Sequence, residues 1–267
     1  MANAATVRLN APKPGDAYVQ SFARGLDVIR SFNTSAPSQT LSGVAQRSGL
    51  SRAGARRILL TLQTLGYVSS DGKLFSLTPR ILDLGFAYLS SMPIWNLAEP
   101  VMESLAGQLK ESCSAAVLDG CDIVYVLRVP THKIMSISLG VGSRLPAFCT
   151  SMGRVLLATL PEAELRQRLE QSDRTARTRY TVCDIDKLTK HIAQVRTQGW
   201  CLVDQELEEG LVSMAAPITG KAGQTVAALN ISGQVNRTDA RHMRRTMLPA
   251  LLEAAQALSG MLGGQRG

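Results

Sequence analysis

The chain has 267 residues, 45% of them hydrophobic, which favours two globular domains, and it contains no apolar run long enough to predict a membrane span. The net charge is +8, and residues 1–90 hold ten Lys and Arg against four Asp and Glu. One third of the chain therefore carries most of the excess positive charge, which favours binding of that region to a polyanion. The five cysteines form no CxxC pair and have no histidine at ligand spacing, which argues against a zinc site or a disulfide framework and favours a reducing cytoplasm.

The N-terminal region begins with residues 1–16, whose prolines and glycine predict a disordered tail rather than a signal peptide. The spacing of Phe22, Leu26 and Ile29 then predicts a helix that ends at Asn33.

Two further helices are predicted on either side of Gly49, a residue that readily takes the positive φ of a tight turn. Thr40 is expected to cap the first of these helices and Ser51 the second. The second helix carries an apolar stripe and ends at Gly66.

Residues 67–78 predict two short strands joined at Asp71-Gly72, a dipeptide that favours a type I′ hairpin turn. Three helices followed by a hairpin are typical of a winged helix-turn-helix, which we assign to residues 17–79. The alternative is three helices packed together for stability alone.

A linker helix is predicted over residues 80–95, where apolar residues recur at helical spacing. The second domain is assigned to residues 96–264. Its first helix must hold Pro100 in the first turn or bend at it.

The rest of the second domain alternates strands and helices. Strands are predicted at 115–118, 123–129, 135–139, 201–203, 211–218 and 225–232. Helices are predicted at 151–160 and 161–169, before Gly199, and from a cap at Thr238 to about residue 262. The mixture predicts an α+β domain with an antiparallel sheet.

The third helix supplies the predicted DNA contacts. Arginines early in such a helix can reach guanine edges or phosphates, and a small residue lets the backbone approach the groove. The predicted contacts are Ser51, Arg52, Ala53, Arg56, Arg57 and, at the hairpin tip, Lys73. Lys73, Arg24 and Arg47 are predicted to contact phosphates rather than bases.

The predicted ligand site lies in the second domain. Free amides around Ser151 and Met152, at the start of a helix, would attract a carboxylate, with Arg144 as a nearby cation. The alternative is ordinary capping by Thr150 or Ser151. Ser213, Asn230 and Ser232 interrupt apolar strands and could fix the other polar atoms of a ligand, or could simply be hydrogen-bonded within the sheet.

Catalytic chemistry has weaker support. Cys149 precedes a helix that could stabilise its thiolate, and Cys121, His132 and His191 are available, but no motif links them. Four acidic residues could hold a metal, although a solvated loop explains them better: Asp204, Glu206, Glu208 and Glu209. We therefore expect neither a metal nor a cofactor.

Several short motifs along the chain match one known family. The N-terminal motifs are SFARGLDVI at 21–29, GLSRAGARRI at 49–58 and LQTLGY at 62–67. The C-terminal motifs are GSRLP at 142–146, MGRVLLA at 152–158, GW at 199–200, DQELEEG at 204–210 and AAP at 215–217. From about residue 18 to 262 the chain therefore resembles the IclR family of bacterial regulators.

Three segments resemble one branch of that family more closely: AFCTSMGR at 147–154, LVDQELEEGL at 202–211 and ALN at 228–230. That branch regulates protocatechuate, 4-hydroxybenzoate and related aromatic-acid catabolism through the β-ketoadipate pathway. The sequence departs from the wider family at Gly153-Arg154, where Gly-Lys is common.

The resemblance implies a GAF-like effector domain, dimers that often pair into tetramers, and binding to palindromic promoter DNA without enzymatic activity. The expected effector is a small organic acid of aromatic catabolism, either aromatic or dicarboxylic. By matched position it implies effector contacts from Ser151, Met152, Asp204 or its neighbour Val203, Ser213, Asn230 and Ser232. Two alternatives remain: a cysteine-dependent enzyme on a GAF-like domain, and a DNA-binding architectural protein without an effector. The sequence does not distinguish an activator from a repressor.

Overall fold

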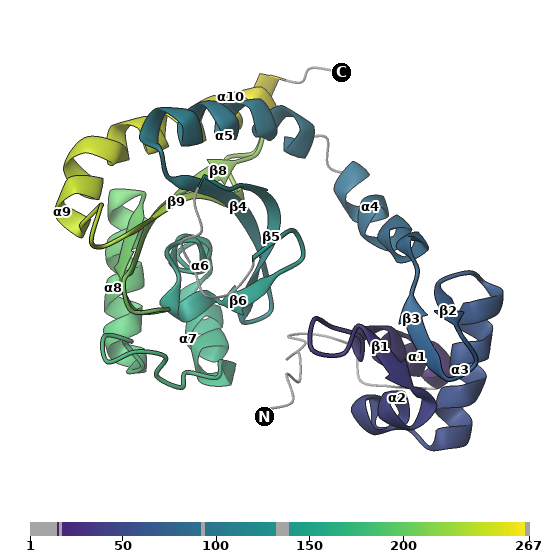
Figure 1. Cartoon of the computed structure of the whole chain (residues 1–267). Helices are drawn as coiled ribbons and strands as arrows, with labels where there is room; N and C mark the ends of the chain where they lie inside the picture. The colour runs from purple at the N-terminus through teal and green to yellow at the C-terminus, as the bar shows by residue number, and fades with distance from the viewer. Residues whose placement is uncertain (1–14, 16–17, 92–93, 132–138, 265–267) are drawn as a thin grey trace. The chain divides into compact units, whose positions relative to one another are not determined.

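The structure, a computed structural model, describes residues 15, 18–91, 94–131 and 139–264. Almost all of the predicted tail and all but Leu139 of the strand predicted at 135–139 lie outside these residues. The chain divides into two units, a smaller one over residues 11–92 and a larger one mainly from residue 93 onward, and each is described by itself (Figure 1). None of the described helices is both long and apolar enough to cross a bilayer.

In the smaller unit, three helices and a three-stranded antiparallel sheet of order β1-β3-β2 precede the linker. These elements are α1 (Gln20–Arg30), β1 (Ser38–Thr40), α2 (Leu41–Ser48), α3 (Arg52–Thr64), β2 (Val68–Ser70) and β3 (Leu74–Leu77). The apolar faces of the helices meet in a core that includes Val28, Val44, Leu59 and Val68. The helix-turn-helix and hairpin predicted from the sequence are confirmed, and β1 is an additional strand that pairs with β3.

Local signals explain the helix boundaries in this unit. The Thr40 hydroxyl accepts a hydrogen bond from the amide of Gly43 at 3.2 Å, and the Ser51 hydroxyl accepts one from Gly54 at 3.1 Å. Both predicted caps are therefore confirmed. Gly49 ends α2 with a φ of 68°, the left-handed conformation for which glycine was expected.

The type I′ turn predicted at Asp71-Gly72 is wrong. That turn needs a positive φ at both residues, and only Gly72 has one. Instead, the Asp71 carboxylate accepts hydrogen bonds from the amides of Lys73 at 2.9 Å and Leu74 at 2.7 Å, which also lower its pKa. A side chain thus closes a connection of three residues between the strands.

The linker differs from the prediction in length. After a 3₁₀ turn at Pro79–Ile81, α4 spans only Leu82–Ser90. The next helix, α5, runs over Ile94–Leu109 and therefore begins inside the range predicted for the linker. Pro100 lies in the interior of α5 rather than in its first turn, so it donates no hydrogen bond to the carbonyl one turn earlier.

The larger unit is built on a six-stranded antiparallel sheet of order β6-β5-β4-β9-β8-β7. The strands are β4 (Ser112–Asp119), β5 (Asp122–Val129), β6 (Arg144–Pro146), β7 (Cys201–Asp204), β8 (Leu211–Thr219) and β9 (Thr225–Gln234). The α+β class is confirmed, and β6 is a strand that the sequence did not indicate.

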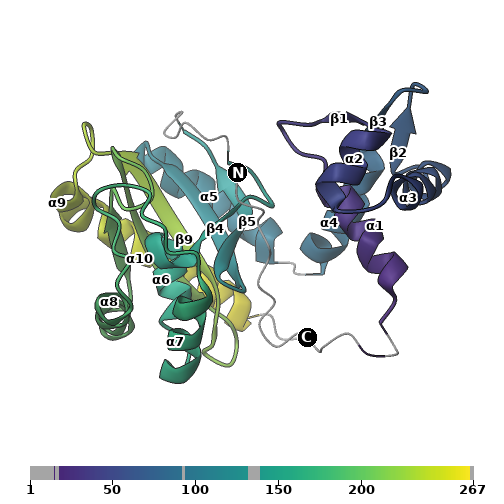
Figure 2. The ribbon, with the colours of Figure 1, turned by 90° about the horizontal axis from the view of Figure 1, so that it is seen from below.

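Helices cover both faces of this sheet. The inner face curls around α6 (Ser151–Leu157), which packs against α8 (Ile185–Gln198), and α8 in turn contacts α7 (Glu162–Gln171) (Figures 1 and 2). The outer face is covered by α5 and α10 (Leu248–Gly264), which lie side by side. An apolar core that includes Phe148, Leu157 and Ile192 lies on the α6 side.

The cap predicted at Thr238 is wrong. Asp239 caps the short helix α9 (Ala240–His242) by accepting the amide of His242 at 2.7 Å, and a π-helical turn at Met243–Met247 leads into α10. The Thr238 hydroxyl instead donates to the buried carboxylate of Glu111 at 2.7 Å. A tertiary hydrogen bond therefore takes the hydroxyl that the sequence assigned to a local cap.

Candidate functional sites

The exposed face of α3 carries most of the residues predicted to contact DNA. All five are exposed: Ser51, Arg52, Ala53, Arg56 and Arg57. On the opposite side of the helix, Ala55 and Leu59 are fully buried, so the core fixes which face α3 presents to solvent. No carboxylate within the described ranges pairs with the three arginines, and their charges stay available to an external anion.

Further cations lie on the neighbouring elements of the smaller unit. Lys73 is exposed in the connection between β2 and β3, and Arg24 on α1 and Arg47 on α2 are also exposed. A helix that follows a tight turn and precedes a hairpin is the arrangement that enters the major groove of DNA. The cations around it are suited to the phosphates beside that groove.

A small cavity in the larger unit lies between the start of α6 and the inner face of the sheet. Its volume is about 20 Å³, enough for a single water molecule. The lining residues are Tyr125, Cys149, Thr150, Ser151, Met152, Leu207, Leu211, Ser213, Asn230 and Ser232. Five of the seven predicted ligand contacts are therefore brought together: Ser151, Met152, Ser213, Asn230 and Ser232.

The sheet side of this cavity is polar. Ser213 on β8 lies opposite Ser232 on β9, and Asn230 is two residues from Ser232, so the three side chains share one face. Asn230 is only 4% exposed, and its Oδ1 has no hydrogen-bond partner in the described part of the chain. Because an unpaired buried amide costs about 1–3 kcal/mol, this oxygen favours a bound group that donates a hydrogen bond.

The helix side of the cavity offers donors. The Thr150 hydroxyl accepts a hydrogen bond from the amide of Gly153 at 3.2 Å, so ordinary capping by Thr150 is confirmed. That cap leaves the amides of Ser151 and Met152 without an acceptor among the residues described. Both lie at the positive end of the helix, where they favour an anion.

Two predicted contacts do not line the cavity. The Arg144 guanidinium donates to the carboxylate of Asp119 at 2.7 Å and to that of Asp122 at 3.3 Å, so two acids already match its charge. Asp204 is exposed at the end of β7, where the alternation of the strand buries Val203 and turns Asp204 outward. The prediction that these residues join the ligand site is thus corrected.

Three cavity residues were missed from the sequence. Tyr125 reaches the cavity from β5, Leu207 from the segment between β7 and β8, and Leu211 from the start of β8. Burial raises the pKa of Tyr125 to about 12, so its hydroxyl stays protonated at neutral pH. No local motif marks these residues, because tertiary contacts between distant segments bring them to α6.

A buried ion pair fixes the segment that carries Leu207. Arg154 on α6 and Glu206 are 3% and 7% exposed, and two hydrogen bonds of 2.7 and 2.6 Å join guanidinium and carboxylate. The Arg154 Nε also donates to the carbonyl of Phe148 at 2.8 Å, and the Val182 amide donates to Glu206 at 3.0 Å. The pair therefore connects α6 to one wall of the cavity.

The residues considered for catalysis do not form a catalytic site. Cys149 is buried, and burial raises the pKa of its thiol to about 12, which opposes the thiolate that a nucleophile needs. His191 is half-buried, and burial together with Arg154 lowers its pKa. His132 lies outside the described residues. Among those described, no group of three or more His, Cys, Asp or Glu side chains could hold a metal ion.

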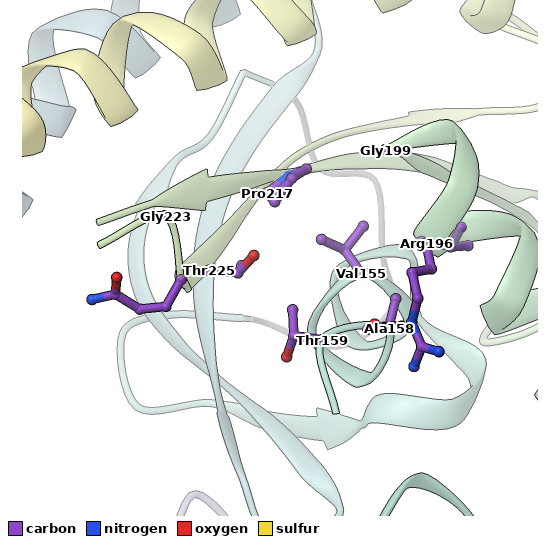
Figure 3. A pocket seen from close by; sticks show the side chains of 10 residues that line it. Val155, Ala158, Thr159, Arg196, Gly199, Pro217, Gly223 and Thr225 are labelled. Carbon is purple, nitrogen blue, oxygen red and sulfur yellow. Dashed lines mark hydrogen bonds between the residues drawn. The ribbon is translucent and has the colours of Figure 1, made fainter. Parts of the chain in front are cut away.

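A larger hollow of about 450 Å³ lies at the other end of α6 (Figure 3). Val155, Ala158, Pro217 and Thr225 line it. Its one cation, Arg196, donates to the carbonyls of Ala158 at 2.8 Å and Leu160 at 2.7 Å, and the guanidinium lies near Ala158 in the view. Because these two carbonyls already occupy the Arg196 guanidinium, the cation of this hollow is less available to an acid, and the smaller cavity is the better candidate.

Comparison with known proteins gives matches along most of the chain. A family described as "IclR helix-turn-helix domain" matches residues 21–72, and one described as "Bacterial transcriptional regulator IclR C-terminal" matches residues 86–260. The Pca regulon regulatory protein of Pseudomonas putida is 45% identical over 248 residues, which cover 92% of this chain and 85% of that protein.

Two further relatives are named for aromatic acids. The p-hydroxybenzoate hydroxylase transcriptional activator of Acinetobacter baylyi is 33% identical over 250 residues, covering 92% of each chain. A crystal structure of an IclR homolog complexed with 4-hydroxybenzoate, from Microbacterium hydrocarbonoxydans, superposes with a TM-score of 0.79 at 24% identity and covers 91% of this chain and 98% of that one. At that identity the likeness supports the fold.

Proposed function

Because the chain belongs to the IclR family of bacterial transcriptional regulators, we propose that α3 reads its operator and that a small organic acid in the α6 cavity controls it. Like its relatives, which are transcriptional regulators, the protein is a DNA-binding regulator and not an enzyme. The observation that carries the DNA assignment is a set of arginines on the exposed face of α3 that pair with no carboxylate in the described part of the chain. A regulator of promoter DNA acts where the chromosome is, which we take to be the cytoplasm.

Replacing Arg56 by alanine is expected to weaken operator binding by about 1–3 kcal/mol if the residue reads a base. The loss would then concentrate at one operator position. If Arg56 touches only phosphate, the loss should be similar on every sequence and should shrink at high salt. Fluorescence anisotropy on operator variants measures both patterns.

Arg179→Ala, which removes an exposed arginine of the larger unit, serves as the matched control and should leave affinity unchanged. Unchanged operator affinity in the Arg52, Arg56 and Arg57 alanine variants alike would reject α3 as the recognition helix.

The effector we propose is a small acid of aromatic catabolism whose carboxylate binds the amides of Ser151 and Met152. Ser213, Asn230 and Ser232 would bind its remaining polar atoms. Support for the aromatic class comes from the relative named for p-hydroxybenzoate hydroxylase and from the homologue complexed with 4-hydroxybenzoate. Because the cavity volume of about 20 Å³ is too small for an aromatic acid, binding must displace flexible apolar side chains such as Met152 and Leu207.

A ligand at about a hundred times its dissociation constant should stabilise the fold by about 2.7 kcal/mol, which a thermal melt detects. We expect 4-hydroxybenzoate or a related aromatic acid to give such a shift. Ser213→Leu should fill the cavity and abolish it, while Thr197→Leu, the same kind of change on the exposed surface of α8, should not. An undiminished shift in the Ser213 variant would place the ligand elsewhere.

We further propose a homodimer in which α4 packs against a second copy, with pairing into a tetramer as a further step. None of the residues of α4 is buried within the chain, although five of its nine are large and apolar; Leu82 and Phe86 are 70% and 68% exposed. A symmetric dimer also lets two recognition helices read both halves of a palindrome. Burial in a partner explains the apolar surface.

The double variant Leu82→Glu, Phe86→Glu should therefore shift the protein toward monomer in light scattering. Because α4 is exposed within one chain, the two changes should not lower the melting temperature of the monomer itself. Tyr180→Glu, at an exposed aromatic residue of the larger unit, is the control and should leave the assembly intact. A wild-type protein that is monomeric while tightly bound to its operator would contradict the proposal.

A further inference from the structure

The polar floor of the effector cavity continues across the sheet beyond the residues that line it. Asn230 on β9 lies directly opposite Ser114 on β4, and Ser114 lies directly opposite Arg128 on β5. Directly paired residues of antiparallel strands share a face, with Cβ atoms about 5 Å apart. Asn230, Ser114 and Arg128 thus form one polar row on the α6 side of the sheet.

Ser114, like Asn230, is a buried polar residue whose side-chain oxygen lacks a hydrogen-bond partner within the described ranges. It is 1% exposed. Two adjacent buried polar groups without partners are unusual in a sheet that is otherwise well paired. They indicate that the row is built to receive polar atoms from outside the protein.

Arg128 ends the row with a charge. It is half-buried, and no carboxylate among the described residues lies within ion-pair distance of it. The sequence from 129 to 143 contains no Asp or Glu that could supply one. The Arg128 charge opposes the rise in the pKa of Tyr125, which shows that the guanidinium lies within electrostatic range of a cavity residue.

We propose that Arg128 is the specificity-determining residue of the effector site and binds a second anionic group, so that the preferred effector is a dicarboxylate. The inference rests on the proposed effector site. One carboxylate would bind at the amides of Ser151 and Met152, and the other would pair with Arg128. Neighbouring strands are about 4.8 Å apart, so the polar row from Asn230 to Arg128 extends about 10 Å at the backbone, which leaves Arg128 free to bind a second group beyond the cavity. An arginine binds a carboxylate in a two-point geometry that a lone ammonium does not reproduce.

The test compares two acids of equal length, adipate with two carboxylates and hexanoate with one, by calorimetry on the full-length protein. Wild type should bind adipate at least tenfold more tightly than hexanoate. Arg128→Met should bring the ratio close to one while leaving hexanoate affinity unchanged. Arg128→Lys should retain part of the preference, and Arg241→Met, at an exposed arginine of the same unit, should retain all of it. Operator affinity and the melting temperature without ligand show whether each variant is folded.

An adipate preference that survives in Arg128→Met would overturn the proposal, as would an equal loss for both acids, since Arg128 would then bind the carboxylate they share. A wild type that binds 4-hydroxybenzoate but not adipate would also overturn it, and the proposed function would stand. A wild type that binds none of the three acids would reject the proposed effector site itself.

Discussion

Replacing Arg154 by methionine is expected to lower the free energy of unfolding of the larger unit by about 3–5 kcal/mol. The change removes one partner of a buried ion pair and leaves the Glu206 carboxylate, 7% exposed, with the amide of Val182 as a remaining donor. An uncompensated buried charge costs far more than the pair contributes. Both tryptophans, Trp95 and Trp200, lie in the larger unit, so their fluorescence in a urea titration reports its unfolding.

Two further variants separate charge from packing. The double variant Arg154→Met, Glu206→Leu should recover much of the lost stability, because it removes both charges. Arg166→Met breaks an exposed pair with Asp186 at 3.1 Å and should change stability by less than about 1 kcal/mol. A double variant as unstable as the single one would mean that shape rather than charge explains the effect.

Gly153→Ala is expected to destabilise the larger unit by at least about 3 kcal/mol. A Cβ at Gly153 would overlap the carbonyl oxygen and the Cα of Ala147, both backbone atoms that cannot move independently of the turn. The 3₁₀ turn at Ala147–Cys149 would have to move away from α6, and it carries part of the cavity wall. The same urea titration measures the loss, and the thermal shift with 4-hydroxybenzoate should disappear with it.

Gly107→Ala is the matched control, because Gly107 is exposed in α5 and a Cβ there would meet nothing within 4 Å. It should stabilise the protein by about 0.5–1 kcal/mol through better helix propensity. If both alanine variants were equally stable, the close approach of α6 to the turn would not be what selects glycine at position 153.

Short-range signals predicted much of this fold. Thr40, Ser51 and Gly49 mark helix boundaries through interactions with residues no more than four positions away. One error, the turn type at Asp71-Gly72, has a local cause, since the Asp71 carboxylate binds amides two and three residues away. Others arose where a side chain has a distant partner. Thr238 would have capped a helix on local grounds, but Glu111, 127 positions away, accepts its hydrogen bond.

The same difference between short-range and long-range interactions explains which parts of the candidate sites could be predicted. The exposed arginines of α3 could be predicted because helical periodicity fixes which face is buried. The cavity could be predicted only in part, since Tyr125 and Ser114 reach the polar face through strand pairings that leave no local motif. Arg144 was misplaced because its acidic partners, Asp119 and Asp122, lie on another hairpin.

The central claim, that an acid in the α6 cavity controls operator binding, is tested most directly by operator affinity with and without effector in the wild type and in Ser213→Leu. With an aromatic acid that shifts the melt, wild-type affinity should change by about 5- to 150-fold, the usual range of allosteric coupling. Ser213→Leu should bind the operator as the free wild type does and show no change on addition of the acid. An acid response of equal size in both proteins, or operator affinity indifferent to an acid that binds the wild type, would contradict the account.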